Sequence, residues 1–192
     1  QPEQLTVGTN WDYAGSFSPD GKMLAFQRQV ATGNWDIFTM ALEGDRTPQP
    51  FLATADMEES PALSPDGRWI AYFSPASGRG EVYVRPFPGP GAAIKVSSGS
   101  GAAPSWNANG KELYYVADDG VWSVPVDTVA GFSAGAPQRL FKLESAECCG
   151  ISSDGKTFYG VRFPPDTGEE HHLVYIPHFA TELERLRNEK RD

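Results

Sequence analysis

The sequence has few cysteines and no long apolar run, and each shortage removes a class of protein. The only two cysteines are adjacent, Cys148 and Cys149. Neighbouring cysteines close a disulfide only with strain, so we expect no structural bridge. No apolar stretch approaches the roughly 20 residues of a membrane-spanning helix, so we expect no membrane insertion.

Basic residues are also fewer than acidic residues. The chain has 16 Lys and Arg against 25 Asp and Glu, which gives a net charge of −9. Repulsion from phosphate therefore argues against a nucleic-acid partner. The 20 Gly and 16 Pro argue against a helical bundle, and 12% aromatic residues argue against disorder. The chain begins at Gln1, without an initiator Met or a signal-peptide pattern, so we expect a processed protein or part of a longer one.

One short pattern recurs four times along the chain. An Asp or Asn followed by Gly occurs at Asp20, Asp66, Asn109 and Asp154, at intervals of roughly 45 residues. Each pair lies between two apolar stretches, and Asp-Gly or Asn-Gly in that setting is the strongest short signal of a β-hairpin. Further short β-rich runs follow each hairpin. Four short strands in each repeat of this length are typical of a β-propeller blade.

The predicted fold is therefore an all-β propeller of four four-stranded blades within residues 1–178. The last repeat has only three strands, and residues 4–7 are expected to supply the fourth and close the ring. Two forms stay open: a self-closed ring, or the C-terminal blades of a larger ring. The blades are expected near 10–54, 55–98, 99–142 and 143–178.

A different pattern follows the last blade. Thr181 and Glu184 are spaced as in a capping box, and Leu183 and Leu186 fall on one helical face. Residues 179–192 are therefore predicted to form a short amphipathic helix and a tail.

Two of the repeats resemble a known family. Residues 16–26, Ser-Phe-Ser-Pro-Asp-Gly-Lys-Met-Leu-Ala-Phe, and 62–72, Ala-Leu-Ser-Pro-Asp-Gly-Arg-Trp-Ile-Ala-Tyr, resemble the repeat of TolB-like, WD-repeat-like β-propellers. Residues 81–91 resemble the propeller region that follows the kinase domain in many bacterial serine/threonine kinases. The resemblance covers nearly the whole chain. It implies a bacterial, kinase-associated, protein-binding propeller in an extracytoplasmic place, periplasmic or on the cell surface.

The motifs of two catalytic classes are absent. The sequence has no kinase Gly-rich loop or catalytic loop, and no Gly-x-Ser-x-Gly nucleophile elbow. We therefore expect that the chain is not an enzyme and has no catalytic residues, and that any kinase activity resides in a domain absent from it. The expected function is a non-catalytic protein-interaction or ligand-sensing module, such as the sensor part of a bacterial serine/threonine kinase or a TolB-like protein. The alternative is a metal-dependent hydrolase or lactonase with its site at the axial mouth.

Alignment of the repeats on the turn residue brings several loops to one face around the axis. Carboxylates dominate these loops, so they could steer a basic protein or peptide, bind calcium, or form only a solvated rim. No cofactor is expected apart from the calcium alternative. The residues predicted to form this ligand- or partner-binding face are Trp11, Asp12, Tyr13, Met57, Glu58, Glu59, Arg79, Asp118, Asp119 and Glu147.

Small residues recur in the strand that should line the axis. A narrow channel requires them, because bulky side chains would overpack it. A closed ring would be a monomer, whereas an open one could pair its edges with a second chain into a dimer. The predicted axial residues are Ala14, Gly15, Ser60, Ala62, Ala103, Ser105, Cys148 and Gly150.

Overall fold

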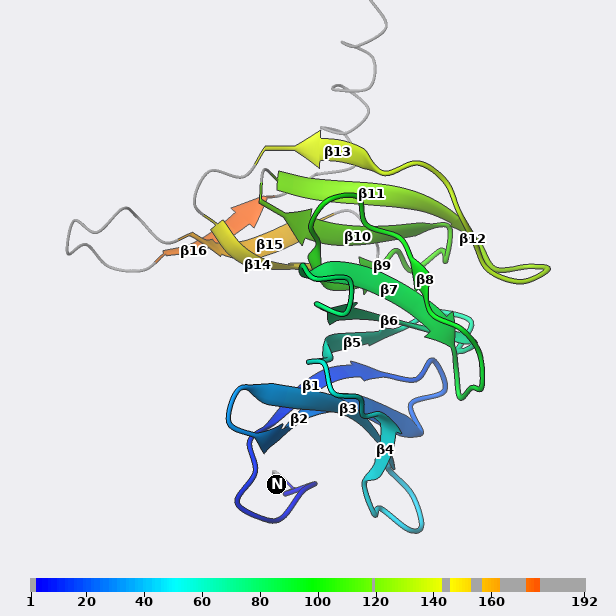
Figure 1. Cartoon of the computed structure of the whole chain (residues 1–192), viewed down its shortest axis with the longest axis vertical. Coiled ribbons are helices and arrows are strands. Elements are labelled where there is room, and N and C mark those ends of the chain that lie inside the picture. The colour runs from blue at the N-terminus through cyan, green and yellow to red at the C-terminus, as the bar shows by residue number, and fades with distance from the viewer. Residues whose placement is uncertain (1–2, 119, 143–145, 153–156, 163–171, 177–192) are drawn as a thin grey trace, which may run out of the picture.

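The computed structural model describes residues 3–118, 120–142, 146–152, 157–162 and 172–176. Within these ranges every regular element is a β-strand, and the strands form four antiparallel sheets. Figure 1 shows the sheets following one another from the N-terminal end, drawn in blue, to the C-terminal strands in orange. Each sheet corresponds to one sequence repeat, so the all-β, blade-by-blade architecture is confirmed.

The first three blades each begin with an inner strand and proceed outward. Blade 1 contains β1 (Asp12–Phe17), β2 (Met23–Ala31), β3 (Asn34–Ala41) and β4 (Gln49–Leu52) in that order. Blade 2 contains β5 (Glu59–Leu63), β6 (Trp69–Ser74), β7 (Glu81–Pro86) and β8 (Ile94–Lys95). Blade 3 contains β9 (Ala102–Trp106), β10 (Glu112–Ala117) and β11 (Gly120–Asp127), with β12 (Ser133–Ala134) and β13 (Gln138–Phe141) both paired to β11.

The fourth blade has three strands in the part of the chain that the structure describes. They are β14 (Ala146–Ile151), β15 (Phe158–Arg162) and β16 (His172–Ile176).

The hairpin turns form as their sequence predicts. In blades 1 and 2 the hydroxyl of the first Ser donates to the Asp carboxylate at 2.6 Å, Ser18 to Asp20 and Ser64 to Asp66. The glycine after each Asp has a positive φ near 70°, which glycine adopts without steric cost. In blade 3 Asn109 replaces the Asp, and its Oδ1 still accepts from the backbone N–H of Lys111 at 2.8 Å. The departure from Ser-Pro-Asp therefore leaves the turn intact.

Apolar clusters between successive blades form the core. Ile37 of blade 1 and Ile70 of blade 2 are fully buried in one cluster. Val84 of blade 2 and Leu113 of blade 3 are fully buried in the next. Successive side chains of a strand point to opposite faces of its sheet. One face therefore contacts the preceding blade and the other the following blade, as expected of sheets packed face to face.

The expected closure of the ring is not observed. Residues 3–10 contain no strand, and Glu3 forms an ion pair with Arg46 of the loop between β3 and β4 at 2.5 Å. The segment 4–7 therefore lies beside blade 1. Within the described residues it forms no strand pairing with blade 4. In Figure 1 the first and fourth sheets lie at different ends of the array. The predicted C-terminal helix, 179–192, lies outside the described residues.

Every inner strand is irregular at the same place. The register shifts between Ala14 and Ser16 in β1, and at the equivalent positions in β5, β9 and β14. In β5 and β9 the irregular residue has a positive φ, 54° at Ser60 and 48° at Ala103. Such values are uncommon outside glycine, so this bulge is a specific feature of the inner strand, of the kind that redirects a strand.

The bulge brings successive inner strands into close contact. Gly15 of β1 faces Pro61 of β5, and a Cβ added at Gly15 would lie 2.6 Å from Pro61 Cγ and closer still to the Pro61 carbonyl oxygen. Only glycine fits between the two strands at this point. The nearest atom belongs to the backbone of Pro61, which cannot move aside as the end of a flexible side chain can.

We predict that Gly15→Ala destabilises the protein by about 1–3 kcal/mol, the usual cost of overpacking. The matched control is Gly135→Ala, where the added methyl would meet Pro125 only at ordinary contact distances of 3.5–3.6 Å. Thermal unfolding followed by circular dichroism measures both. Equal melting temperatures for the two variants would contradict the close approach of β1 and β5.

Candidate functional site

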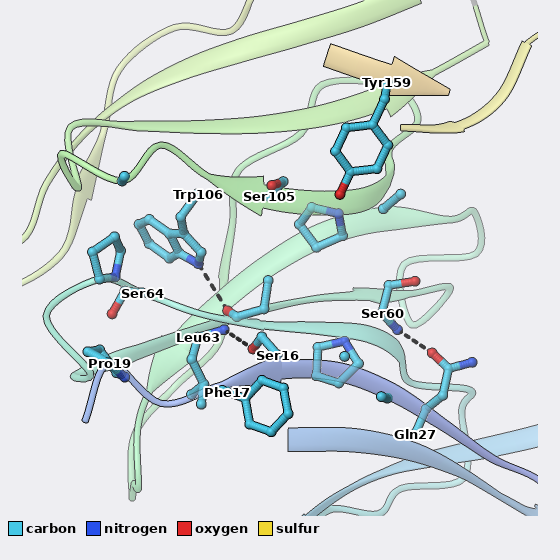
Figure 2. Close-up of a pocket in the computed structure, with 18 residues that line it drawn as sticks. Ser16, Phe17, Pro19, Gln27, Ser60, Leu63, Ser64, Ser105, Trp106 and Tyr159 are labelled. Carbon is cyan, nitrogen blue, oxygen red and sulfur yellow. Dashed lines mark hydrogen bonds between the residues drawn. The ribbon is translucent and has the colours of Figure 1, made fainter. Parts of the chain in front are cut away.

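A cleft of about 780 Å³ runs along the axial side of the inner strands. Its walls come mainly from β1, β5 and β9 and the turns that follow them, with one residue each from β2 and β15 (Figure 2). The volume falls within the about 300–1,000 Å³ of typical ligand sites. The lining residues are Ala14, Gly15, Ser16, Phe17, Pro19, Gln27, Ser60, Pro61, Ala62, Leu63, Ser64, Pro65, Ala103, Pro104, Ser105, Trp106, Ala108 and Tyr159.

The cleft contains the small residues predicted for the inner strands of the first three blades, beside bulky ones such as Phe17 and Trp106. All six of the predicted small residues from blades 1 to 3 belong to its walls. The other two, Cys148 and Gly150, lie in β14, whose side chains are outside the described part of the structure. Among the described residues that line the cleft, none carries a charge. These walls are polar only through hydroxyl, amide, indole N–H and backbone groups.

Three hydrogen bonds fix β5, the inner strand of blade 2, between its two neighbours. The backbone N–H of Leu63 donates to Ser16 Oγ at 2.7 Å, and that of Ser60 donates to Gln27 Oε1 at 2.7 Å. From the other side, Trp106 Nε1 donates to the Ala62 carbonyl at 2.9 Å. Figure 2 shows all three as dashed lines. These bonds use three backbone groups of β5, so a ligand would contact this strand mainly through its side chains.

Sequence reasoning missed several residues of the cleft, including Ser16, Phe17, Gln27 and Tyr159. Ser16 and Gln27 act across a blade boundary, and no local pattern marks such a contact. Phe17 and Tyr159 occupy repeat positions that predict core residues, yet they are 59% and 48% exposed.

The aromatic and acidic residues predicted on blade 1 lie outside the cleft lining. Asp12 forms a bidentate ion pair with Arg28, at 2.7 and 2.9 Å. The hydrogen bond from Arg28 lowers the pKa of the Asp12 carboxyl below its ordinary value. Trp11 is 65% exposed, and Tyr13 packs against Trp35 with ring centroids 5.3 Å apart. Asp12 is therefore engaged within its own blade.

The residues predicted from the loop before β5 differ in exposure. Glu58 is almost fully buried, and its carboxylate accepts from Thr54 through both the hydroxyl and the backbone N–H. Met57 and Glu59 are half-buried. Burial raises the pKa of the Glu59 carboxyl.

The predicted residues of blades 2 to 4 complete the set. Arg79 is exposed and donates to the Gly99 carbonyl at 3.2 Å, and Asp118 is exposed. Asp119 and the side chain of Glu147 lie outside the described part. None of the other eight residues lines the cleft, and the shared role of the ten as a binding face stays a prediction.

The described residues contain neither a cluster of metal-binding side chains nor a membrane-spanning helix. No group of three or more His, Cys, Asp or Glu side chains is placed there to hold a metal ion. No helix among them has the length and apolar character needed to cross a membrane.

Two buried carboxyl groups interact near the boundary of blades 1 and 2. Asp36 is 7% exposed, and its Oδ1 has no hydrogen-bond partner. Burial raises the pKa of Asp36. Burial also raises the pKa of Glu58, and the negative charges of Asp36 and Asp56 add to that rise while hydrogen bonds from Thr54 oppose it. Both groups therefore bind a proton more readily in the folded state than in the unfolded chain.

A raised pKa in the folded state means that the fold binds these protons more tightly than the unfolded chain does. The contribution of Asp36 to stability is therefore greatest at low pH and is lost as pH rises through its raised pKa. We predict that Asp36→Asn stabilises the protein at about pH 7.5, by on the order of 1 kcal/mol, and gives no gain at about pH 4. Melting temperatures at both pH values measure this difference from the wild type.

Asp45→Asn is the control for this experiment. Hydrogen bonds from the Thr47 hydroxyl and backbone lower the pKa of exposed Asp45, so its removal should give no gain at neutral pH. If Asp36→Asn stabilised the protein equally at both pH values, the effect could not come from a buried Asp36 carboxylate that ionises between them.

Comparison with known proteins gives matches of fold. No protein-family model and no curated protein matches the sequence. Among solved structures, TolB from Acinetobacter baumannii is 20% identical over 85% of this chain and 40% of its own length, with a TM-score of 0.62. A TolB-type protein from Agrobacterium tumefaciens is 18% identical over 90% of this chain and 61% of its own, with a TM-score of 0.57. The chain thus spans less than two thirds of either protein.

The same comparison corrects one expectation, that the chain is not an enzyme. Several structures of this fold are enzymes. One is a gluconolactonase from Xanthomonas campestris, 14% identical over 75% of this chain and 51% of its own, with a TM-score of 0.53. The absence of kinase and serine-hydrolase motifs excludes only those two mechanisms. At these identities the shared property is the fold, and the blades of this chain resemble those of the TolB β-propeller.

Proposed function

We propose that the chain is a binding module that holds an uncharged segment of a partner protein in its axial cleft. The observation that carries the proposal is the cleft itself, whose described walls contain no charged residue. Burial of a charged ligand group there would leave that charge unpaired, at a high desolvation cost. Apolar and hydroxyl-bearing groups of a ligand would instead contact side chains of similar polarity in the cleft.

The chemistry of the cleft differs from that expected of the acidic face. An acidic face would favour a basic partner, but Asp12 is neutralised by Arg28 and Glu58 is buried beside Thr54. Neither carboxylate lines the cleft. We therefore propose a neutral ligand segment in place of a basic one.

The wider context of the module is also a proposal. Residues 81–91 resemble the propeller region of bacterial serine/threonine kinases, which supports a role as the sensor part of such a protein. An extracytoplasmic location goes with that role and with the TolB-like fold.

Substitution at the centre of the cleft tests the function. Ser105 lines the cleft, and Ser105→Arg would both fill the space and add a charge. We predict that neutral peptides selected from a random peptide library on the wild-type protein bind this variant at least about tenfold more weakly, a loss of about 1.4 kcal/mol. Fluorescence anisotropy with labelled peptides provides the measurement, and Ser133→Arg, at an exposed serine of β12 away from the cleft, is the matched control.

Two results would contradict the proposal. Peptides that bind Ser105→Arg as tightly as the wild type would place the site elsewhere, and selection of strongly basic peptides would favour the acidic face. Lactone hydrolysis that requires added calcium would support the hydrolase alternative in its place.

A further inference from the structure

Two aromatic side chains lie exposed on the walls of the axial cleft. Phe17 of β1 is 59% exposed and Tyr159 of β15 is 48% exposed, and both line the same cleft. Figure 2 shows Phe17 at the blade 1 end of the cleft and Tyr159 at the blade 4 end. A ligand that lies along the cleft would therefore contact an aromatic ring at each end.

Prolines form a further part of the same walls. Pro19, Pro61, Pro65 and Pro104 all belong to the lining. Proline has no backbone N–H group, so these residues add apolar surface to the cleft and no main-chain hydrogen-bond donor.

The central strand β5 has few main-chain groups left for an added strand. The N–H groups of Ser60 and Leu63 already donate to side chains of blade 1, and Pro61 between them has no N–H. The Ala62 carbonyl accepts from blade 3. A segment that binds by strand addition needs free main-chain groups on the strand it joins. The bonding of β5 therefore argues against a ligand in a β-strand conformation.

Side-chain hydroxyl groups are the donors that face the cleft instead. Ser105 and Tyr159 both line it, and Figure 2 shows the Tyr159 hydroxyl pointing from β15 toward the cleft. A hydroxyl donates one hydrogen bond and can reach the carbonyl oxygen of a ligand. The cleft thus combines aromatic rings with donors for carbonyl groups.

We propose that the partner segment in the axial cleft is proline-rich and is bound as a polyproline II helix. This inference rests on the proposed function, because it names the class of segment that the cleft holds. A polyproline II helix has no internal hydrogen bonds, so its carbonyl oxygens can accept from the hydroxyls of Ser105 and Tyr159. Its proline rings are uncharged and dock in aromatic-lined grooves. Phe17 and Tyr159 supply the rings.

The conformation of such a segment also suits a small site. The polyproline II helix is already formed in the free segment, so little conformational entropy is lost on binding. The described walls carry no charge, and a run of prolines brings none. Both properties favour a proline-rich segment over a flexible or charged one.

A neutral oligosaccharide would also suit an uncharged cleft. Each of its hydroxyl groups needs a polar partner when it is buried. Gln27 is the one amide side chain among the described lining residues, and its Oε1 already accepts from the Ser60 N–H at 2.7 Å. The walls therefore favour the proline-rich segment.

Three uncharged, end-capped and fluorescently labelled peptides of equal length test the inference on the whole chain. One contains only proline, the second alternates Gly and Ser, and the third alternates Thr and Val. Fluorescence anisotropy measures their dissociation constants. We expect the proline peptide to bind at least about tenfold more tightly than the other two.

Substitutions of the aromatic side chains locate the binding site. Phe17→Ala and Tyr159→Ala should each weaken binding of the proline peptide at least about fivefold. Tyr159→Phe keeps the ring and loses the hydroxyl, so its affinity should fall between those of the wild type and Tyr159→Ala. Val129→Ala, at a residue that is 82% exposed and outside the cleft walls, should bind as the wild type does. Circular dichroism should show every variant folded, since each substitution is at an exposed side chain.

The outcomes separate this inference from the proposed function. If the Gly-Ser or Thr-Val peptide binds as tightly as the proline peptide, and Ser105→Arg weakens that binding, the proposed function stands and the inference is wrong. If none of the uncharged peptides binds, both are wrong. Proline-peptide binding that is unchanged in Phe17→Ala and Tyr159→Ala would place the site outside the cleft. Tighter binding of maltohexaose than of the proline peptide would assign the cleft to an oligosaccharide.

Discussion

The structure depends on how closely successive inner strands approach one another at the axis. Gly15 and Pro61 are so close that no side chain fits between them. The hydrogen bond from Leu63 to Ser16 holds the same pair of strands in register. Because the backbones meet there, the blades diverge outward, and the space between them is filled by the buried apolar clusters. The axial cleft is the other consequence, since strands that meet at the bulge leave their small side chains facing the axis.

Much of this arrangement could be predicted from the sequence, for reasons that are local. Asp20-Gly21 and its equivalents predict hairpins because the turn needs a residue that accepts a positive φ, and their spacing then sets the number of blades. The small size of Ala62 and Ser105 likewise follows from their repeat position. The partners of Asp12 and Glu58 could not be predicted this way. Arg28 reaches Asp12 because β1 and β2 pair Asp12 with Arg28 in register, and Glu58 turns toward Thr54 in a loop that has no repeat pattern.

The exposure of Phe17 illustrates a second limit. By residue type and repeat position it is equivalent to Leu63 and Trp106, which are buried. Hydrophobic periodicity tells which side of a strand is apolar, but it does not tell whether a neighbour covers that side. In a repeat protein the place of a unit in the array decides this, because each unit contacts only its neighbours. The same limit applies to Tyr159 at the other end.

The paired register also explains why equivalent acids behave in opposite ways. Asp36 and Glu81 occupy the same place in blades 1 and 2, directly before the buried Ile37 and Val82. Burial raises the pKa of Glu81, but hydrogen bonds from Ser77 and Lys95 outweigh it and bring the pKa below its ordinary value. Lys95 pairs with Tyr83 in β7, and the matching residue beside Phe38 in β3 is Pro50, which has no cation to offer. Asp36 therefore keeps an unpartnered oxygen and a raised pKa. The hydrogen bond from Ser77 in the preceding loop and the cation of Lys95 in the outer strand together give Glu81 a pKa shift opposite to that of Asp36. The pH response of this fold is therefore set by the loops and edges of its blades as well as by their core.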